Sequence, residues 1–400
     1  NALSGSGNIR GIVRFGGAII AARGTHIYRS SGSGWTQLTD STSFPASTAT
    51  AKVNGATSST TTLVVDNNTG TILVGMVVTG TGISGTVTVQ TVTDQNNLVL
   101  SSSQSLSNNV DLTFTEKSPT IGGSGKVRFA EYNFTGTDKL FIVDGNGKPY
   151  IFTGTSLAQQ TSLASDFAGA DFVTVHLERL FVAIGTTIIC SGAASASSDN
   201  FSGSTSFEFD GTITDIITFR EQLIIFSQNG IKKLTGKTNS DFAILPITDD
   251  VGAIAPDTVQ EVGGDVMFLA ADGLRLLGAT ERIGDFSLAV VSKSIQPEFS
   301  KFTANSTSFS SITIREKSQY RIFGYNAGFT DDAALGIIGT QFASQGGEGM
   351  AWAETRGINS FAATSSYDSE TEFIYFANDD GYIYRLESGN SFDGSDISAT

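Results

Sequence analysis

The feature that most restricts the fold is a unit that recurs along the chain: an apolar strand, a short glycine-containing turn and a second strand. Asn-Gly and Asp-Gly tolerate the positive φ angles of type I′ turns, so each copy predicts a β-hairpin. The clearest copies span residues 19–28, 140–152, 180–189, 223–234, 266–277 and 373–386, with turns near positions 24, 146, 185, 230, 273 and 381.

The spacing of these hairpins predicts the architecture. The middle turns lie roughly 40 residues apart, which is the length of a four-stranded propeller blade. A weaker unit occupies the interval between the turns at 273 and 381, with strands expected at 311–315, 320–325 and 335–339. Counting it, we predict an all-β protein folded as a β-propeller of about seven blades.

Composition agrees with many short strands joined by tight turns, because the chain has 45 Gly and 28 Phe but only six Pro. The one helix that we expect is short, at residues 296–302 with its approach from Leu288. A single cysteine, Cys190, excludes an intramolecular disulfide, and two histidines are too few for a structural Cys/His metal site. We therefore predict no bound metal and no cofactor.

Residues 46–115 differ from the rest of the chain. They contain one lysine (Lys52), three aspartates (Asp66, Asp94 and Asp111) and no aromatic side chain except Phe114. Their apolar runs alternate with Thr and Ser and bend at Gly or Asn, which predicts a small β-sandwich or barrel. Because loops accept insertions at low entropic cost, we place this module in the first blade. The expected domains are residues 1–45 (first blade), 46–115 (inserted module) and 116–400 (remaining blades).

The charge balance restricts the partners. The chain has 24 Lys and Arg against 39 Asp and Glu, a formal net charge of −15, which disfavours tight general binding to nucleic acid. It has no run of eighteen apolar residues, so we expect no membrane span. The first residues lack the pattern of a signal peptide, and an initial Asn indicates processing or a longer parent chain. We predict that residues 391–400 form the outer strand of the last blade.

Catalysis is not expected from the side chains on offer. A Ser-His-acid site needs a base beside its nucleophile, but His26 follows a hairpin turn and His176 alternates along a strand. Cys190 ends an apolar strand without a basic neighbour, which favours an inert thiol. The segment 30–35 faintly resembles the Asp-box turn of sialidases, yet it lacks the Asp. We therefore predict a protein that is not an enzyme, with no catalytic, cofactor-binding or metal-binding residues.

The remaining motifs have structural explanations. The acid pairs Asp249-Asp250, Asp331-Asp332 and Asp379-Asp380 fall in turns, where Asp stabilises a bend. Residues 144–147 begin like a calcium loop but lack its distal Glu, so a hairpin turn accounts for them. Gly263-Gly264 and Gly346-Gly347 precede no expected helix and are not phosphate loops. Aromatic residues that alternate at 373–376 and 382–384 suit packing between blades, although a glycan platform would also use them.

Two segments carry a resemblance to a known family. Residues 209–216 with 222–234, and residues 252–275, resemble the propeller of tailed-phage virion proteins, the packaged-DNA stabilisation or tail hub and nozzle proteins of short-tailed phages. The likeness covers about residues 200–280, and the other blades match by pattern. The stretch 75–89 is similar to small β-domains found in phage structural proteins.

This resemblance implies a homo-oligomeric ring, typically of six subunits, below the head–tail adaptor of the virion tail. The genome would leave through the ring without specific binding, next to the adaptor and other tail or fibre proteins, and an acidic wall would repel DNA phosphates. Two other functions remain open. One is a carbohydrate-binding propeller, a surface or secreted lectin or adhesin, and the other is a glycoside hydrolase. A polyvalent lectin should repeat its binding residues in each blade, whereas these turns repeat only Gly and Asp or Asn.

Overall fold

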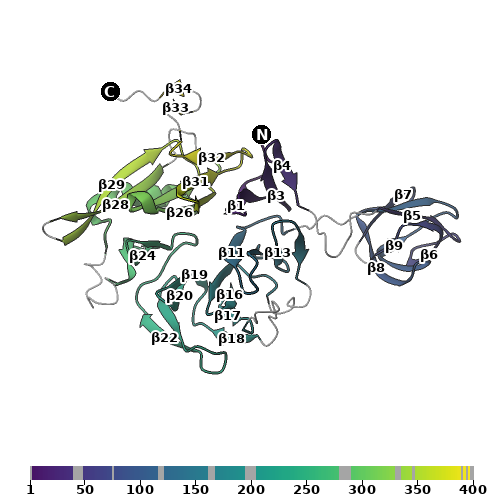
Figure 1. The fold of residues 1–400 in the computed structure, drawn as a ribbon, viewed down its shortest axis with the longest axis horizontal. Coiled ribbons are helices and arrows are strands. Elements are labelled where there is room, and N and C mark those ends of the chain that lie inside the picture. The colour runs from purple at the N-terminus through teal and green to yellow at the C-terminus, as the bar shows by residue number, and fades with distance from the viewer. Residues whose placement is uncertain are drawn as a thin grey trace. The chain divides into compact units, whose positions relative to one another are not determined.

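The computed structural model describes residues 2–38, 48–73, 76–115, 121–160, 167–193, 204–278, 290–328, 335–344, 347–388, 391–392 and 395–396. Most of them lie in antiparallel β-sheets that form a seven-bladed propeller and, separately, a closed barrel (Figure 1). The predicted all-β propeller with an inserted β-module is therefore confirmed. No helix in the described part of the chain is long and apolar enough to cross a membrane.

The first four blades are four-stranded meanders in which chain order equals sheet order. Blade 1 holds β1 (Ile9–Phe15), β2 (Ala18–Arg23), β3 (His26–Ser31) and β4 (Gly34–Gln37); blade 2 holds β11 (Arg128–Tyr132), β12 (Lys139–Val143), β13 (Tyr150–Phe152) and β14 (Leu157–Gln159); blade 3 holds β15 (Phe172–His176), β16 (Arg179–Ile184), β17 (Thr187–Cys190) and β18 (Thr205–Glu208); blade 4 holds β19 (Ile213–Phe219), β20 (Gln222–Ser227), β21 (Ile231–Thr235) and β22 (Ala243–Thr248).

The last three blades vary in strand number and include the predicted weaker unit as blade 6. Blade 5 holds β23 (Gln260–Val262), β24 (Asp265–Ala270) and β25 (Gly273–Leu276); blade 6 holds β26 (Ser308–Ile314), β27 (Gln319–Tyr325), β28 (Leu335–Ser344) and β29 (Gly347–Arg356); blade 7 holds β30 (Ala362–Asp368), β31 (Thr371–Ala377) and β32 (Ile383–Leu386). The expected helix is present as α2 (Gln296–Asn305), between the short 3-10 turns η2 (Lys293–Ile295) and η3 (Arg315–Lys317).

The end of the chain differs from its prediction. The described residues of the last segment form β33 (Ser391–Phe392) and β34 (Ser395–Asp396), which pair with each other as a separate two-stranded sheet. The prediction that they supply the outer strand of the last blade is therefore wrong. The four described residues pair with each other and not with β32 of the last blade.

Turn chemistry agrees with the prediction at five hairpins, where Gly24, Gly145, Gly185, Gly273 and Gly381 have positive φ, and differs at one. Both central residues have positive φ, as a type I′ turn requires, in the turn that joins the first and second strands of several blades, at Gly16-Gly17, Leu177-Glu178, Arg220-Glu221 and Gly263-Gly264. The predicted Asn229-Gly230 turn, in contrast, has no positive φ. Its glycine instead lies close to a neighbouring strand, because a Cβ there would be 3.2 Å from the Thr248 carbonyl oxygen, a tight contact.

The propeller core lies between neighbouring blades. The first strands of the seven blades face the centre, and side chains from adjacent sheets interdigitate around the ring. Phe226 of blade 4 and Phe268 of blade 5, both fully buried, meet with ring centroids 5.3 Å apart. Such contacts explain the expected alternation of aromatic residues along the strands.

The first and last blades meet without exchanging a strand. Leu3, which precedes β1, and Ile9, the first residue of β1, bond instead to the turn of blade 7: the N–H of Leu3 donates to the Gly381 oxygen at 2.8 Å, and that of Ile9 to the Asn378 oxygen at 2.7 Å. Arg23, which is 6% exposed, adds bonds to the backbone oxygens of Gly7 at 3.0 Å and Asp379 at 2.9 Å. These bonds add to the apolar cluster in which Ile9 and Ile12 of blade 1 join Ala362 and Tyr375 of blade 7, and together they close the ring.

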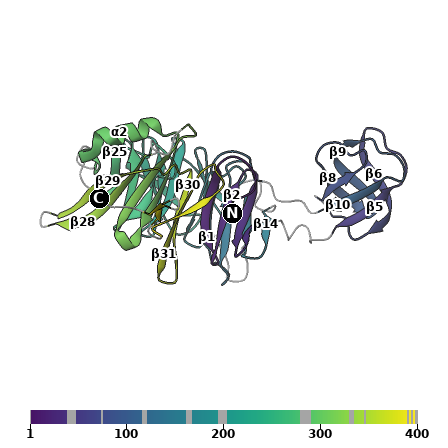
Figure 2. The same cartoon turned by 90° about the horizontal axis from the view of Figure 1, so that it is seen from above.

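The module is a barrel and not a sandwich, and in chain order it lies between the complete blade 1 and blade 2 instead of within the first blade as predicted. Its six strands follow the closed order β10-β5-β6-β9-β8-β7, and Figure 2 shows β5, β6, β8, β9 and β10 around their common core. The core is aliphatic apart from Phe114. The predicted boundary at 45/46 lies outside the described residues, and that at 115/116 borders the undescribed residues 116–120. The strands are β5 (Ala49–Val53), β6 (Thr60–Thr69), β7 (Val77–Gly80), β8 (Val87–Asp94), β9 (Asn97–Gln104) and β10 (Asp111–Thr115).

Candidate functional site

The residues considered for catalysis have structural surroundings. His176 in β15 is 4% exposed, its ring meets Phe181 edge-on at 5.7 Å, and burial lowers its pKa. His26 begins β3, where its Nδ1 lies 3.3 Å from the Thr25 hydroxyl. Burial raises the pKa of Cys190 to about 12, so its sulfur stays a thiol, which is a poor nucleophile. These three side chains therefore support the interpretation of ordinary strand and turn roles.

The calcium-like turn at 144–147 is fully used by backbone bonds. Asp144 is 4% exposed, and its Oδ1 accepts from the N–H groups of Asn146 at 3.0 Å and Gly147 at 2.8 Å. Its Oδ2 accepts from the N–H of Gly122. Both oxygens are therefore occupied in shaping the turn. No group of three or more His, Cys, Asp or Glu suited to a metal ion is found within the described ranges.

The other predicted turn acids divide into three cases. Asp380 accepts from the backbone N–H of Tyr382 at 2.7 Å, a local bond that stabilises the hairpin of blade 7. Asp331-Asp332 lies outside the described residues. Asp249 is exposed at the rim of a depression in blade 4, described below. Among the glycine pairs, Gly263-Gly264 forms the tight turn between β23 and β24, and Gly346 lies outside the described residues.

Charged side chains that the sequence analysis did not identify meet at the propeller axis. A cavity of about 260 Å³ lies there, lined by residues from the inner side of all seven blades. The Arg128 guanidinium at the start of β11 binds both carboxylate oxygens of Asp257, with Nε at 2.7 Å and a terminal nitrogen at 2.9 Å. The Lys126 ammonium lies 3.4 Å from the same carboxylate. We call Lys126, Arg128, Asp215 and Asp257 the axial charge cluster.

The axial charge cluster ties blades together. Arg128, from blade 2, donates to the Asp171 backbone oxygen at the entrance of blade 3 at 2.7 Å and stacks over Phe172 at 4.2 Å. Lys126 donates to the Phe309 oxygen of blade 6 at 2.6 Å and to the Phe361 oxygen beside blade 7. Asp257 precedes the first strand of blade 5. The cluster thus bonds distant segments across the axis.

The two carboxyl groups of the axial charge cluster have different pKa values because their electrostatic surroundings differ. Burial would raise the pKa of Asp257, but the adjacent Arg128 and Lys126 outweigh it and lower the pKa to about 2. Asp215 in β19 lacks such close cations, so burial, reinforced by the Asp257 charge, raises its pKa to about 7. Side chains of Lys126, Arg128 and Asp257 keep 12%, 17% and 25% exposure respectively, so they touch the cavity without lying free in water.

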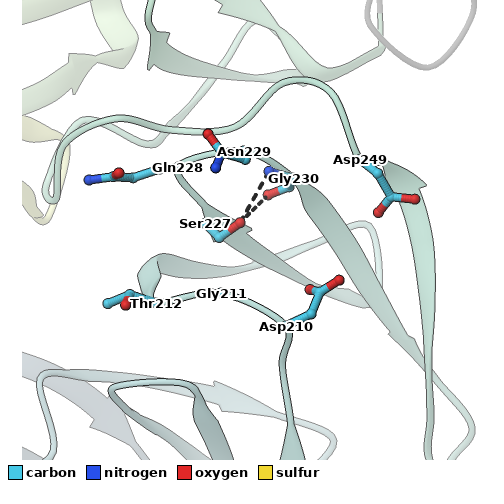
Figure 3. Close-up of a pocket in the computed structure, with 8 residues that line it drawn as sticks. All are labelled: Asp210, Gly211, Thr212, Ser227, Gln228, Asn229, Gly230 and Asp249. Carbon is cyan, nitrogen blue, oxygen red and sulfur yellow. Dashed lines mark hydrogen bonds between the residues drawn. The ribbon is translucent and has the colours of Figure 1, made fainter.

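Blade 4 carries a second cavity, of about 290 Å³, at the end where β20 turns into β21 (Figure 3). Ser227 forms its floor, and its hydroxyl is held by the backbone N–H and oxygen of Gly230, each at 3.1 Å. Asp210 and Asp249 lie on one side and Thr212 and Gln228 on the other, with Asn229 above. We call this the blade-4 pocket.

Sequence patterns gave a weak signal for the axial charge cluster. Asp215 lies between apolar residues of its strand, which marks a residue facing a special environment, but nothing in the sequence pairs 128 with 257. Asp210 and Asn229 both fall within the phage-like segments, and Asn229 lies in the hairpin turn predicted near position 230. Their convergence with Asp249 was not predicted.

Comparisons with known proteins establish only likeness of fold. No family model and no curated protein matches the chain. Among solved structures it is similar to the extracellular domain of a putative one-component system from B. thetaiotaomicron (11% identity, TM-score 0.46, 98% of this chain and 40% of that one). The computationally designed Ika8 protein (10%, 0.41, 96% and 97%) and the N-terminal domain of Nup159 (10%, 0.40, 65% and 74%) also match. The chain thus spans less than half the length of the first of these.

Proposed function

We propose that this protein is a structural subunit of a short-tailed phage tail, a hub or nozzle component that assembles into a ring around the exit path of the genome. The observation that carries the proposal is the pair of phage-like segments, because residues 209–275 correspond to blade 4 and the hairpin of blade 5. A likeness that covers contiguous structural units is better support than scattered matches.

The axial charge cluster supports a structural role over a catalytic one. Its cations and Asp257 bind each other and backbone oxygens, so they stabilise the association of blades. A catalytic acid or base would need a reacting group within its reach. Charged groups committed to neighbouring blades are typical of a scaffold.

The axial charge cluster fills the centre of the propeller, which bears on where DNA would pass. The axial cavity encloses about 260 Å³ and contains the Arg128–Asp257 ion pair. Double-stranded DNA, whose major groove alone is about 12 Å wide, does not fit there. The channel in this proposal is therefore framed by several subunits, which requires heterologous contacts between different sides of neighbouring copies. The net charge of −15 would let DNA slide past without sticking.

Virions provide the decisive test. Depleting the protein during phage growth, with wild-type complementation as the control, should produce filled heads that leak DNA or tails without their distal section. Electron microscopy of complete virions should place duplex density between propellers. Intact, infectious particles without the protein would refute the proposal, and complete particles that fail to attach to host glycans would favour a lectin.

A further inference from the structure

The hairpin turns between the second and third strands of the blades differ in how their polar side chains are used. In blade 2, both carboxylate oxygens of Asp144 accept backbone N–H groups. In blade 5, Asp272 binds the buried Arg275 guanidinium, with Oδ1 2.9 Å from Nε. In blade 7, Asp380 accepts from Tyr382. In these three turns, the acidic side chain is therefore already bound to a group of the protein.

The polar side chains in the turn of blade 4 are not bound in this way. Gln228 and Asn229 are exposed, and no hydrogen bond to either side chain is found within the described chain. The same holds for Thr212 and Asp249 on the surrounding loops. Figure 3 shows these groups around one cavity instead of dispersed over the surface. A small-molecule site needs a few convergent polar groups to orient its ligand, and these side chains are available for that role.

Small residues create the space. A Cβ at Gly211 would lie 3.5 Å from the Ser227 side chain. A Cβ at Gly252 would lie 1.9 Å from the backbone oxygen of Ser227. The second contact lets the loop after β22 pack directly against the turn. The walls are therefore held by backbone packing, and the 290 Å³ cavity is close to the lower limit of about 300 Å³ for small-molecule pockets.

The polar groups select the ligand by chemistry. Asp210 is ionised, since its hydrogen bond with Lys232 at 2.6 Å lowers its pKa, and one oxygen remains for a ligand. Carboxylates accept hydrogen bonds, amides both donate and accept, and the Thr212 hydroxyl does both. Two acidic groups repel phosphates and carboxylates. The described residues also offer no metal-binding group of three acids. Neutral molecules with adjacent hydroxyl groups match this mixture.

We propose that the blade-4 pocket binds one neutral sugar ring, with Asp210 and Asp249 accepting hydrogen bonds from ring hydroxyls and Gln228 and Asn229 bonding to the opposite edge. The inference does not depend on the virion role, and a tail subunit and a lectin could each carry such a site. Because none of the described residues that line the pocket is an aromatic one able to stack on the ring, we expect a dissociation constant of about millimolar order.

Ligand-observed NMR with the purified full chain tests this. The probes are the methyl glycosides of glucose, galactose and mannose, N-acetylglucosamine, xylose and glycerol, each titrated to about 50 mM. We expect saturable transfer to at least one sugar and none to glycerol. Asp249→Asn and Gln228→Ala should each weaken that binding by about tenfold, equivalent to about 1.4 kcal/mol.

The control is Asp250→Asn, which makes the same charge change one residue outside the pocket and should leave binding unchanged. Absence of binding by every sugar, or binding that both pocket variants retain, would overturn the proposal. So would saturable calcium binding that Asp249→Asn abolishes, because it would make the pocket a cation site. Virion depletion phenotypes are independent of these outcomes.

Discussion

The barrel and the propeller both close a ring, but by different interactions. In the barrel, β10 pairs with β5 on one side and with β7 on the other, so backbone hydrogen bonds complete the circle. In the propeller, separate sheets meet through side chains such as Phe226 and Phe268, and charged groups join blades across the axis. Propeller stability should therefore depend strongly on individual side chains and on pH, and barrel stability much less on charge.

The largest effect should come from removing an aromatic ring between blades. Phe226→Ala leaves a cavity beside Phe268 and should lower the free energy of unfolding of the propeller by about 3 to 5 kcal/mol. Regional hydrogen exchange, measured by mass spectrometry on the full chain, gives this value separately for the two parts. Phe114→Ala is the matched barrel variant and should weaken protection in residues 49–115. Equal loss of protection in both parts with either variant would contradict the comparison.

Breaking the axial charge cluster should come next. Asp257→Asn removes the charge that faces Arg128 and Lys126 and leaves two cations without a counter-ion. A fully buried pair would cost roughly 3 to 5 kcal/mol, and the residual exposure reduces our expectation to about 2 kcal/mol. Chemical denaturation followed by propeller fluorescence measures it. An unchanged midpoint would show that the cluster does not hold blades together.

The pH dependence should have opposite signs in two ranges. Because folding raises the pKa of Asp215 to about 7, the folded state keeps a proton that the unfolded chain releases above about pH 4, so stability falls as pH rises from 4 to 7. The lowered pKa of Asp257, about 2, makes stability fall as pH drops from 4 to 2. The slope cannot exceed about 1.4 kcal/mol per pH unit for one proton.

Denaturation curves at several pH values check this prediction. Asp215→Asn should remove the loss of stability between pH 4 and 7 while leaving the acid limb in place. Barrel protection should not decline over pH 4 to 7, since its Asp94 has a pKa lowered by hydrogen bonds from Asn97 and Asn96. A wild-type curve that is flat from pH 4 to 7 would contradict the assignment of Asp215.

The smallest effect should come from the surface ion pair of the barrel. The Lys52 Nζ lies 2.7 Å from the Asp111 Oδ1, but the two side chains are 39% and 82% exposed. Water screens such a pair, so Asp111→Asn should cost less than about 1 kcal/mol. Barrel exchange rates in low and high salt provide the measurement. A loss as large as that of Asp257→Asn would remove the electrostatic difference between the two regions.

Some predictions failed because one residue has several possible backbone roles. Gly230 was expected to supply positive φ, yet its φ is not positive and its backbone packs closely against Thr248. Leu177 and Glu178 have the positive φ angles of a type I′ turn although neither residue type favours them. Strand pairing on both sides imposes that geometry, and local preference is too weak to reveal it. The two-stranded pairing of β33 and β34 was also missed, because local residue preference does not reveal which strands pair.

The sequence by itself determined the β-propeller class, the number of blades and the distinct composition of the inserted module. Periodic hairpins and a compositional break are local signals, and they persist in the order of the residues. Only the tertiary structure decided which charges meet on the axis and which polar groups converge in blade 4. Lys126 and Asp257 are 131 positions apart in the chain, and Asp210 and Asp249 are 39 apart. Their proximity comes from the closing of sheets around a centre, and no short stretch of sequence encodes that.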